Sequence, residues 1–432
     1  MAAPRAGSIS SLEKFLDTLK SRPVDASVEL LTSLLRRRQI KGAEASATAT
    51  AHIFLQVVAR DKWANVDQLL IRIQLIGRKL VAAQPHELVI GNIVKRVLGL
   101  IRDEASEDRN DATADSAPSA FPSTSVLDQA TPTPPSKPVR PPTLSALGSL
   151  ARTQSMFNLL SDPKVFSSAG SAASTPGQLS GASTPTLISQ STNLSALRSE
   201  VIDGIQEIMD EIKSVDEQVQ TYADTFIYPG DYVLVYQPSR TVQKFLTRAA
   251  SKRKFTLFLV VDPSMAASSA GPYASFVKSM GSNGSSVITV SNAGLMAYMS
   301  RVDKVILGAR AITAQGGVVV DSGATAIARV ARERQRTVVV LGGVYKLSPE
   351  SQLLPTNQIE WGDPSKYVSF ADGSLASHVK VHSAVSEFLP ADQVDMYITN
   401  LGAHSQGNLH AIMMDHYKEE DIDFNLYGKA QR

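Results

Sequence analysis

The spacing of apolar residues is helical in the first hundred residues of the chain. Between residues 10 and 103, apolar side chains recur three or four positions apart, which places them on one face of an α-helix. Two such series are Val66, Leu69, Leu70, Ile73, Ile76 and Leu80, and then Val89, Ile93, Val97 and Leu100. The pattern predicts an N-terminal helical domain over residues 1–104.

A more regular apolar series lies between residues 193 and 228. Its members alternate steps of four and three: Val201, Ile205, Ile208, Ile212, Val215, Val219, Tyr222 and Phe226. Such a narrow seam is suited to packing lengthwise on another helix, either in a partner or within the same chain. We therefore expect a long connecting helix over residues 193–228.

From residue 229 onward, short β-branched runs alternate with segments of helical length. The runs are Tyr232–Tyr236, Phe255–Val261, Ser286–Val290, Lys304–Leu307 and Thr337–Leu341, and the segments are 239–252, 272–281, 292–300 and 322–335. Strands that are apolar throughout are typical of a parallel sheet covered on both faces. The predicted fold class is therefore α/β, with the N-terminal helical domain followed by a C-terminal Rossmann-like parallel sheet domain over residues 229–432. Ligands of such sheets usually bind at the carboxyl ends of the strands.

Composition identifies a segment that fits neither pattern. Eleven of the 22 prolines fall between Pro118 and Pro185, among many Ser, Thr and Ala residues. Such a sequence buries too little apolar surface to offset the entropy of ordering it. We expect residues 105–192 to form a disordered insertion, for which a tolerated linker is a simpler interpretation than a phosphorylated or docking element.

Charge and cysteine content exclude several classes of function. Lys and Arg number 43 against 41 Asp and Glu, and the net charge of +2 is too small to predict a direct nucleic-acid partner. The absence of cysteine excludes disulfides, Cys-ligated metals and thiolate nucleophiles. With no secretion signal and no run of 18 apolar residues, we expect a cytoplasmic protein without a membrane partner. The acidic run Glu419–Asp423 is interpreted as a solvated segment.

The carboxyl edge of the predicted sheet carries no recognisable catalytic or cofactor motif. The first turn after a strand, residues 236–240, reads Tyr-Gln-Pro-Ser-Arg and lacks the glycines of a dinucleotide site, and the chain has no phosphate-binding loop. His378 and His382 lie in a strand-like stretch of about 13 Å, too long for two ligands of one zinc ion. We expect no cofactor and no metal, and we interpret Ser239 and Asp321 as helix caps.

Several segments on both sides of the insertion carry a family resemblance. They are Ala82–Pro85, Gly91–Leu98, Ser239–Val242, Lys252–Phe255, Met299–Ala309, Tyr345–Pro349 and Ile398–Gly402. In these segments the chain resembles the regulatory subunits (alpha, beta and delta) of eukaryotic translation initiation factor 2B and their sugar-phosphate isomerase relatives. The last two segments, together with the ending around Tyr417–Asp421, resemble one of the three subunit types in particular.

The resemblance allows an enzyme hypothesis to be tested residue by residue. The isomerases carry a catalytic Cys six positions after the Asp that opens the first strand, and counting from Asp231 reaches Gln237. Their catalytic Asp follows a Gly-Ala pair, where this chain has Arg310. An amide and a permanent cation cannot exchange protons near neutral pH, so the resemblance implies that the isomerase chemistry is lost. The candidates for a vestigial pocket or an interface are Gln237, Ser239, Arg240, Arg310, Gln315 and Asp321.

The resemblance therefore implies a non-catalytic regulatory subunit of the guanine nucleotide exchange factor for translation initiation factor 2. The implied partners are the alpha, gamma, delta and epsilon subunits of initiation factor 2B, together with the alpha subunit of initiation factor 2, whose phosphorylation the regulatory core would sense. Two alternatives remain open. One is a divergent sugar-phosphate isomerase, and the other is a non-catalytic sensor of a sugar phosphate or nucleotide, in which Arg240 and Arg310 both face the old pocket.

Overall fold

The structure is a computed structural model that describes residues 11–114, 186–261, 273–350, 359–363, 373 and 380–422. The predicted disordered insertion, residues 105–192, lies mostly outside these residues. The two helices that flank it extend into the predicted range, since α5 runs from Leu88 to Ala114 and α6 from Thr186 to Thr221. Both helices are therefore longer than the apolar pattern predicted.

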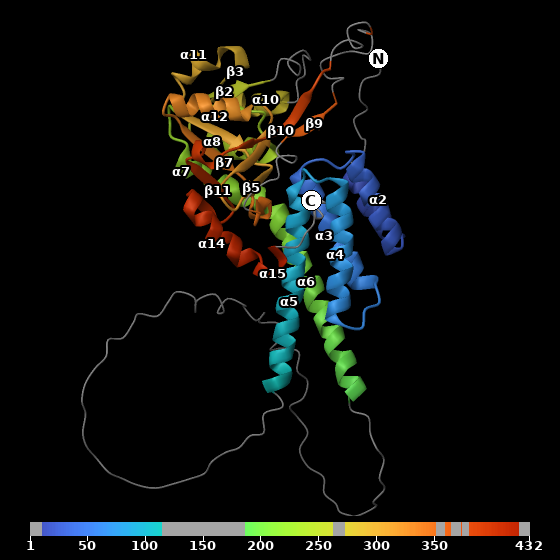
Figure 1. Cartoon of the computed structure of the whole chain (residues 1–432). Helices are drawn as coiled ribbons and strands as arrows, with labels where there is room; N and C mark the ends of the chain where they lie inside the picture. Colours follow the sequence, from blue (N-terminus) through green and yellow to red (C-terminus); the bar gives the residue numbers. More distant parts are fainter. Residues whose placement is uncertain are drawn as a thin grey trace, which may run out of the picture. The chain divides into compact units, whose positions relative to one another are not determined.

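The N-terminal part consists of helices packed around one apolar core (Figure 1). These helices are α1 (Ser11–Leu19), α2 (Val24–Arg36), α3 (Ala43–Arg60), α4 (Val66–Ala83) and α5. The predicted apolar face of α4 is buried from Leu69 to Leu80, while Ile71 and Leu75 point to solvent. The predicted helical region is confirmed, and its apolar spacing is what forms the core.

The apolar seam packs within the chain. Its six members from Val201 to Val219 are buried in α6, in the same core as α5. A Cβ added at Gly204 would come within 2.6 Å of the Leu100 side chain, so the two helices touch closely at this glycine. The short helix α7 (Ala223–Phe226) follows α6 and leads into the sheet domain. Of the two partners that the seam allowed, the structure contains the one inside the chain.

A seven-stranded sheet organises the C-terminal part, with strand order β12-β11-β7-β4-β1-β2-β3. Its strands are β1 (Tyr232–Tyr236), β2 (Thr256–Val260), β3 (Ser286–Val290), β4 (Lys304–Gly308), β7 (Thr337–Leu341), β11 (Met396–Thr399) and β12 (Gly402–His404). The five predicted strands are all present within a residue or so of their expected bounds, and all neighbouring pairs are parallel except β11 with β12. The predicted α/β fold class is confirmed.

Helices cover both faces of this sheet. One face contacts α8 (Arg240–Lys252) and α10 (Ala274–Ser282) in the core that includes the N-terminal helices. The other face contacts α11 (Leu295–Met299), α12 (Ala324–Glu333) and α14 (Gln406–His416). The last described helix is α15 (Glu419–Ile422). Among the described residues, no helix is long and apolar enough to cross a bilayer.

A second, five-stranded sheet was not predicted from the sequence. Its order is β8-β5-β6-β10-β9, and its strands are β5 (Ala311–Thr313), β6 (Val318–Asp321), β8 (Leu347–Ser348), β9 (Glu360–Gly362) and β10 (Ser383–Leu389). Most of these strands are very short, and β6 pairs antiparallel with β10 from far along the chain. Short strands with distant partners leave little trace in local periodicity. This sheet brings β9 to the carboxyl end of β4.

Candidate functional site

The turn after β1 holds Gln237, the residue at the position where the isomerases have cysteine. Gln237 lies in the left-handed region of backbone space, with φ of 39°. Its side-chain amide donates to the Tyr236 hydroxyl at 3.0 Å, and this hydroxyl donates to the carbonyl of Ser322 at 2.6 Å. The amide is therefore engaged in a hydrogen-bonded chain, and it offers no ionisable proton.

Ser239 and Arg240 start helix α8. The Ser239 hydroxyl accepts from the backbone N–H of Val242 at 3.4 Å, which confirms the predicted helix cap. Arg240 is 70% exposed, and its guanidinium lies 3.7 Å from Asp216 and 3.8 Å from Glu44. Its partners therefore belong to α6 and α3 rather than to the turns at the sheet edge.

Arg310 follows β4 and is held by two carboxylates. Its Nε donates to Asp321 Oδ1 at 2.7 Å, and its Nη1 donates to Glu360 Oε2 at 3.3 Å. Burial alone would lower the pKa of Arg310, but the neighbouring carboxylates, Asp321 foremost, outweigh it and raise that pKa. Arg310 is a permanent cation whose charge is balanced inside the protein.

Asp321 does not cap a helix, contrary to the prediction from sequence. It ends β6 and pairs with Arg310, while the cap of α12 comes from Glu387 in β10. The Glu387 carboxylate accepts from the N–H groups of Gly323 and Thr325 at 3.0 and 2.7 Å. The capping residue Glu387 belongs to a strand of the second sheet. The sequence alone does not show that this strand lies beside α12.

Three further charged residues complete the group around Arg310, and the sequence analysis did not identify them. Glu360 pairs with Arg38 at 2.7 Å and is nearly inaccessible, with 6% of its side chain exposed. Lys346 is buried and donates to the carbonyl of Ala309 at 2.9 Å, and burial lowers its pKa. The Glu87 residue as a whole is partly exposed, but its carboxyl group is surrounded by protein. This burial raises its pKa to about 7.

We call this group the sheet-edge charge network. It contains three cations and three carboxylates: Arg38, Arg310 and Lys346, with Glu87, Asp321 and Glu360. Glu87 and Lys346 lie beside or within segments that carry the family resemblance, a signal that could have found them. Glu360 lies in a three-residue strand and gave no such signal. The two arginines of the network are already paired with carboxylates, and the buried Lys346 is bonded to a backbone carbonyl.

Gln315 and the histidines do not join this network. Gln315 lies at the tip of the β5–β6 hairpin, at the opposite end from Arg310 and Asp321, and its carbonyl accepts from the Gln406 side chain at 2.9 Å. His382 packs edge-on against Trp361, with ring centroids 5.1 Å apart, and His378 lies outside the described residues. In the described part of the chain, no cluster of His, Asp and Glu is suited to bind a metal.

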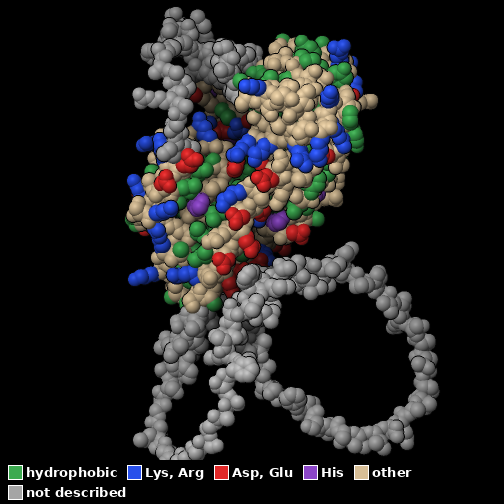
Figure 2. All heavy atoms as spheres, turned by 180° about the vertical axis from the view of Figure 1, so that it is seen from behind, with side chains coloured by type: hydrophobic (Ala, Val, Ile, Leu, Met, Phe, Trp, Pro, Cys, Tyr) green, Lys and Arg blue, Asp and Glu red, His purple; other side chains and the backbone are tan. Residues whose placement is uncertain are grey.

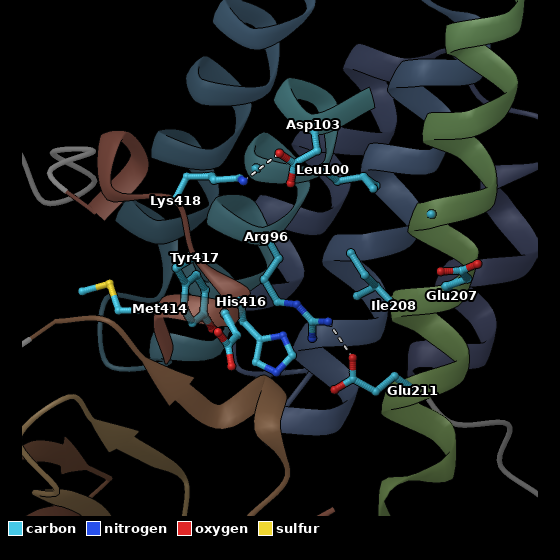
Figure 3. Close-up of a pocket in the computed structure, with 13 residues that line it drawn as sticks. Arg96, Leu100, Asp103, Glu207, Ile208, Glu211, Met414, His416, Tyr417 and Lys418 are labelled. Atoms are coloured by element: carbon cyan, nitrogen blue, oxygen red, sulfur yellow. Dashed lines mark hydrogen bonds and ion pairs between the residues drawn. The ribbon is translucent and has the colours of Figure 1, made fainter. Parts of the chain in front are cut away.

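A cleft of about 450 Å³ lies between α5, α6, the end of α14 and the residues that follow it (Figure 3). Arg96 points across it to Glu211, with a distance of 2.6 Å between them, and Lys418 pairs with Asp103 at 2.7 Å. Burial lowers the pKa of His416 beside this pair. Ion pairs thus link the C-terminal segment and α6 to α5.

The acidic run after this cleft is partly buried, so its interpretation as a solvated segment was wrong for Asp421. The Asp421 side chain is 1% exposed and pairs with Arg102 at 3.2 Å, and Glu420 pairs with the same guanidinium at 2.8 Å. Burial raises the pKa of Asp421, and Arg102 opposes the change. The run therefore anchors the C-terminal segment to α5.

Comparison with known proteins gives consistent matches over most of the chain. The model of the Initiation factor 2 subunit family matches residues 39–406. Translation initiation factor eIF2B subunit beta of Schizosaccharomyces pombe is 32% identical over 419 residues, which cover 94% of this chain and 99% of that protein. Both matches extend over the N-terminal helical part and the C-terminal sheet part.

Solved structures agree with this similarity. The crystal structure of eIF2B beta from Chaetomium thermophilum is 40% identical with a TM-score of 0.67, and the alignment covers 96% of this chain and 99% of that chain. A chain of the tetrameric eIF2B-beta2-delta2 complex from C. thermophilum is 37% identical with a TM-score of 0.63, covering 94% and 100%. By contrast, the ribose 1,5-bisphosphate isomerase of Pyrococcus furiosus is 25% identical over 213 residues, 49% of this chain and 64% of that protein.

Proposed function

Since this chain belongs to the initiation factor 2 subunit family, we propose that it acts as a non-catalytic, beta-type regulatory subunit of translation initiation factor eIF2B. The similarity to eIF2B beta proteins extends over more than nine tenths of the chain, whereas the isomerase is similar over about half of it. The beta-type similarity also agrees with the segments Tyr345–Pro349 and Ile398–Gly402. The subunit is a regulatory component in the exchange of guanine nucleotide on initiation factor 2.

The part of this proposal that denies isomerase activity is based on one observation, the surroundings of Arg310. Arg310 lies where the isomerases have a catalytic carboxylate, and it is bound by Asp321 and Glu360. General acid–base catalysis needs groups that change protonation near the working pH. Neither Arg310 nor Gln237 does so, and a lone titratable Glu87 has no partner acid at the turn after β1. The old pocket is therefore a structural element of the fold.

The same contacts disfavour a sugar-phosphate sensor. Phosphate binding at this edge would require a cation with free donors there, but Arg310 is bound by two carboxylates, and the exposed Arg240 lies toward Asp216 of α6 and Glu44 of α3 rather than toward the turns of this edge. A phosphate would have to displace two carboxylates from Arg310, and that displacement would break the ion pair of Asp321 with Arg310, while Glu360 would keep Arg38. We therefore rank the sensor below the regulatory subunit.

For the partners we propose first a delta-type subunit, because the C. thermophilum structure is a complex of beta with delta. Beyond this pair we propose the alpha, gamma and epsilon subunits, and the alpha subunit of initiation factor 2 in its phosphorylated and unphosphorylated forms. Sensing of that phosphate and a cytoplasmic location belong to the same proposal.

Co-expression with a delta-type subunit tests this function. We expect a tag on this chain to recover both subunits in equal amounts, and native mass spectrometry to show a complex with equal copies of each. A matched control is the same experiment with the isomerase relative in place of this chain, which should not retain the delta-type subunit. A chain that stays alone in the presence of excess delta-type subunit would refute the proposal.

A further inference from the structure

Helix α8 carries four basic residues one helical turn apart. We call them the α8 basic stripe: Arg240, Lys244, Arg248 and Lys252. Steps of four place these side chains on one face of the helix, over a length of about 18 Å. The opposite face is buried in the core through Val242, Phe245, Leu246, Ala249 and Ala250. The stripe is therefore the outward face of a helix that the core holds rigidly.

The stability of α8 does not explain the stripe. Like charges four residues apart on a helix destabilise it by a few tenths of a kcal/mol per pair, and the stripe contains three such pairs in series. Arg240 also opens the helix, where the positive end of the helix dipole disfavours a cation. A row of cations that opposes helix formation is stabilised by carboxylates from outside the helix.

Carboxylates of the same chain already bind to both ends of the stripe. At the start of α8, Asp216 lies 3.1 Å from Lys244 and also accepts from the Thr241 hydroxyl at 2.7 Å. At the other end, Asp224 of α7 pairs with Lys252. The stripe thus recognises carboxylates with well-formed geometry at two places.

The middle and the outer side of the stripe remain open. Arg248 is exposed, and in the described part of the chain no carboxylate pairs with it. The side chains of Arg240, Lys244 and Lys252 stay 70%, 34% and 49% exposed even with their carboxylate partners. Figure 2 shows one face of the molecule, on which several Lys and Arg side chains gather in a band with Asp and Glu side chains beside them. Positive charge is therefore available for a partner at this surface.

We propose that the α8 basic stripe is a docking surface for an acidic segment of a partner protein, whose carboxylates lie about one helical turn apart and meet Arg248 at the centre. Protein carboxylates are favoured over nucleic acid for two reasons. The aromatic residue of α8, Phe245, is buried, so the stripe offers no ring on which bases could stack. The groups that the stripe binds within this chain, Asp216 and Asp224, are themselves protein carboxylates, so its side chains are already arranged for this chemistry.

Fluorescence anisotropy with the full-length chain tests the proposal. The probe is a labelled helical peptide that carries glutamates four residues apart, and the variant is Arg248→Glu. Reversing one charge removes an attraction and adds a repulsion, so we expect the dissociation constant to rise about tenfold. We also expect binding to weaken as salt is added, and the same peptide with glutamine for glutamate not to bind.

The matched control is Arg329→Glu. Arg329 is an equally exposed arginine on α12, which covers the other face of the sheet, so its reversal should leave the dissociation constant within about twofold of the original. Equal losses in both variants would show nonspecific attraction and overturn the proposal, as would a glutamate peptide that does not bind. Tighter binding of an oligouridylate RNA that is lost in Arg248→Glu would overturn it in favour of nucleic acid.

The proposal goes beyond the regulatory role and can fail separately from it. Recovery of the delta-type subunit is scored in its own experiment, and the melting temperature of Arg248→Glu verifies that the variant is folded. Because Arg248 makes no ion pair within the described chain, we expect that temperature to be unchanged or slightly raised.

Discussion

Two groups of charged residues on this molecule differ in how their charges are used. In the sheet-edge charge network, Arg310 is sheltered and bound by Asp321 and Glu360. In the α8 basic stripe, Arg248 is exposed and lacks a carboxylate partner among the described residues. The number of arginines and lysines in a region therefore says little about binding. What matters is whether the protein has already neutralised them, and here only the stripe has charge to offer a partner.

Removing a carboxylate from the network should have the largest effect on stability. Glu360→Ala removes the carboxylate that Arg38 and Arg310 share; because both arginines are partly exposed and Arg310 keeps Asp321, we expect a loss of about 2 kcal/mol. Urea unfolding measures the loss. As a control, Asp210→Ala removes the exposed pair with Lys213 and should change the free energy of unfolding by less than about 0.5 kcal/mol. Similar values for the two variants would contradict the comparison.

The pH dependence of stability should reveal Glu87. Its pKa in the folded protein is raised from 4.5 to about 7, so between these pH values the folded protein binds more protons than the unfolded chain. The free energy of unfolding should therefore fall as pH rises through this window. Glu87→Gln keeps the neutral form and should remove up to about 2 kcal/mol of that fall. Parallel pH profiles for the original chain and the variant would show that Glu87 is not perturbed.

Asp216 shares a feature with each group, since its side chain is buried but pairs with Lys244 and Arg240 of the stripe. Asp216→Asn keeps an acceptor for Thr241 but loses the charge that faces Lys244 and Arg240. We expect a loss of about 1 kcal/mol, measured by urea unfolding. Glu44→Gln is the exposed control, because Glu44 lies 3.8 Å from Arg240, and it should change stability by less than about 0.5 kcal/mol.

The smallest effect, and one of opposite sign, is expected at Arg248. Arg248→Glu changes two repulsive interactions, with Lys244 and Lys252, into attractive ones. It should therefore raise the free energy of unfolding by about 0.5 kcal/mol. Thermal unfolding measures the change, with Arg248→Ala as an intermediate step. A loss of more than about 1 kcal/mol would mean that Arg248 supports the fold, and the stripe would no longer need a partner to explain it.

The sequence predicted those parts of the fold that depend on local apolar spacing. The strand Tyr232–Tyr236 and the helix after it are each determined by a few adjacent residues, so their bounds were nearly right. The second sheet was missed because most of its strands have only two to four residues and because β10 pairs with β6 from far along the chain. The same distance explains the error at Asp321, where Glu387 provides the cap that the local pattern assigned to Asp321.

The candidate site was predicted in part. Gln237 and Arg310 were found because the family resemblance fixes their positions relative to a strand start and a Gly-Ala pair. Glu360, which pairs with Arg310, was not found, since it follows Arg310 by fifty residues and lies on a strand of three. Charge balance in a folded protein depends on which distant residues meet, and local sequence contains little information on this.

The central claim, that the sheet edge is chemically inactive, is tested most directly by assaying the purified full-length chain for isomerisation of ribose 1,5-bisphosphate, the sugar phosphate for which the Pyrococcus furiosus relative is named. We expect no conversion above that of buffer at any pH between about 5 and 9, because Gln237 and Arg310 do not titrate in that range. Conversion that is saturable and abolished by Glu87→Gln would show a working active site at this edge and contradict the claim.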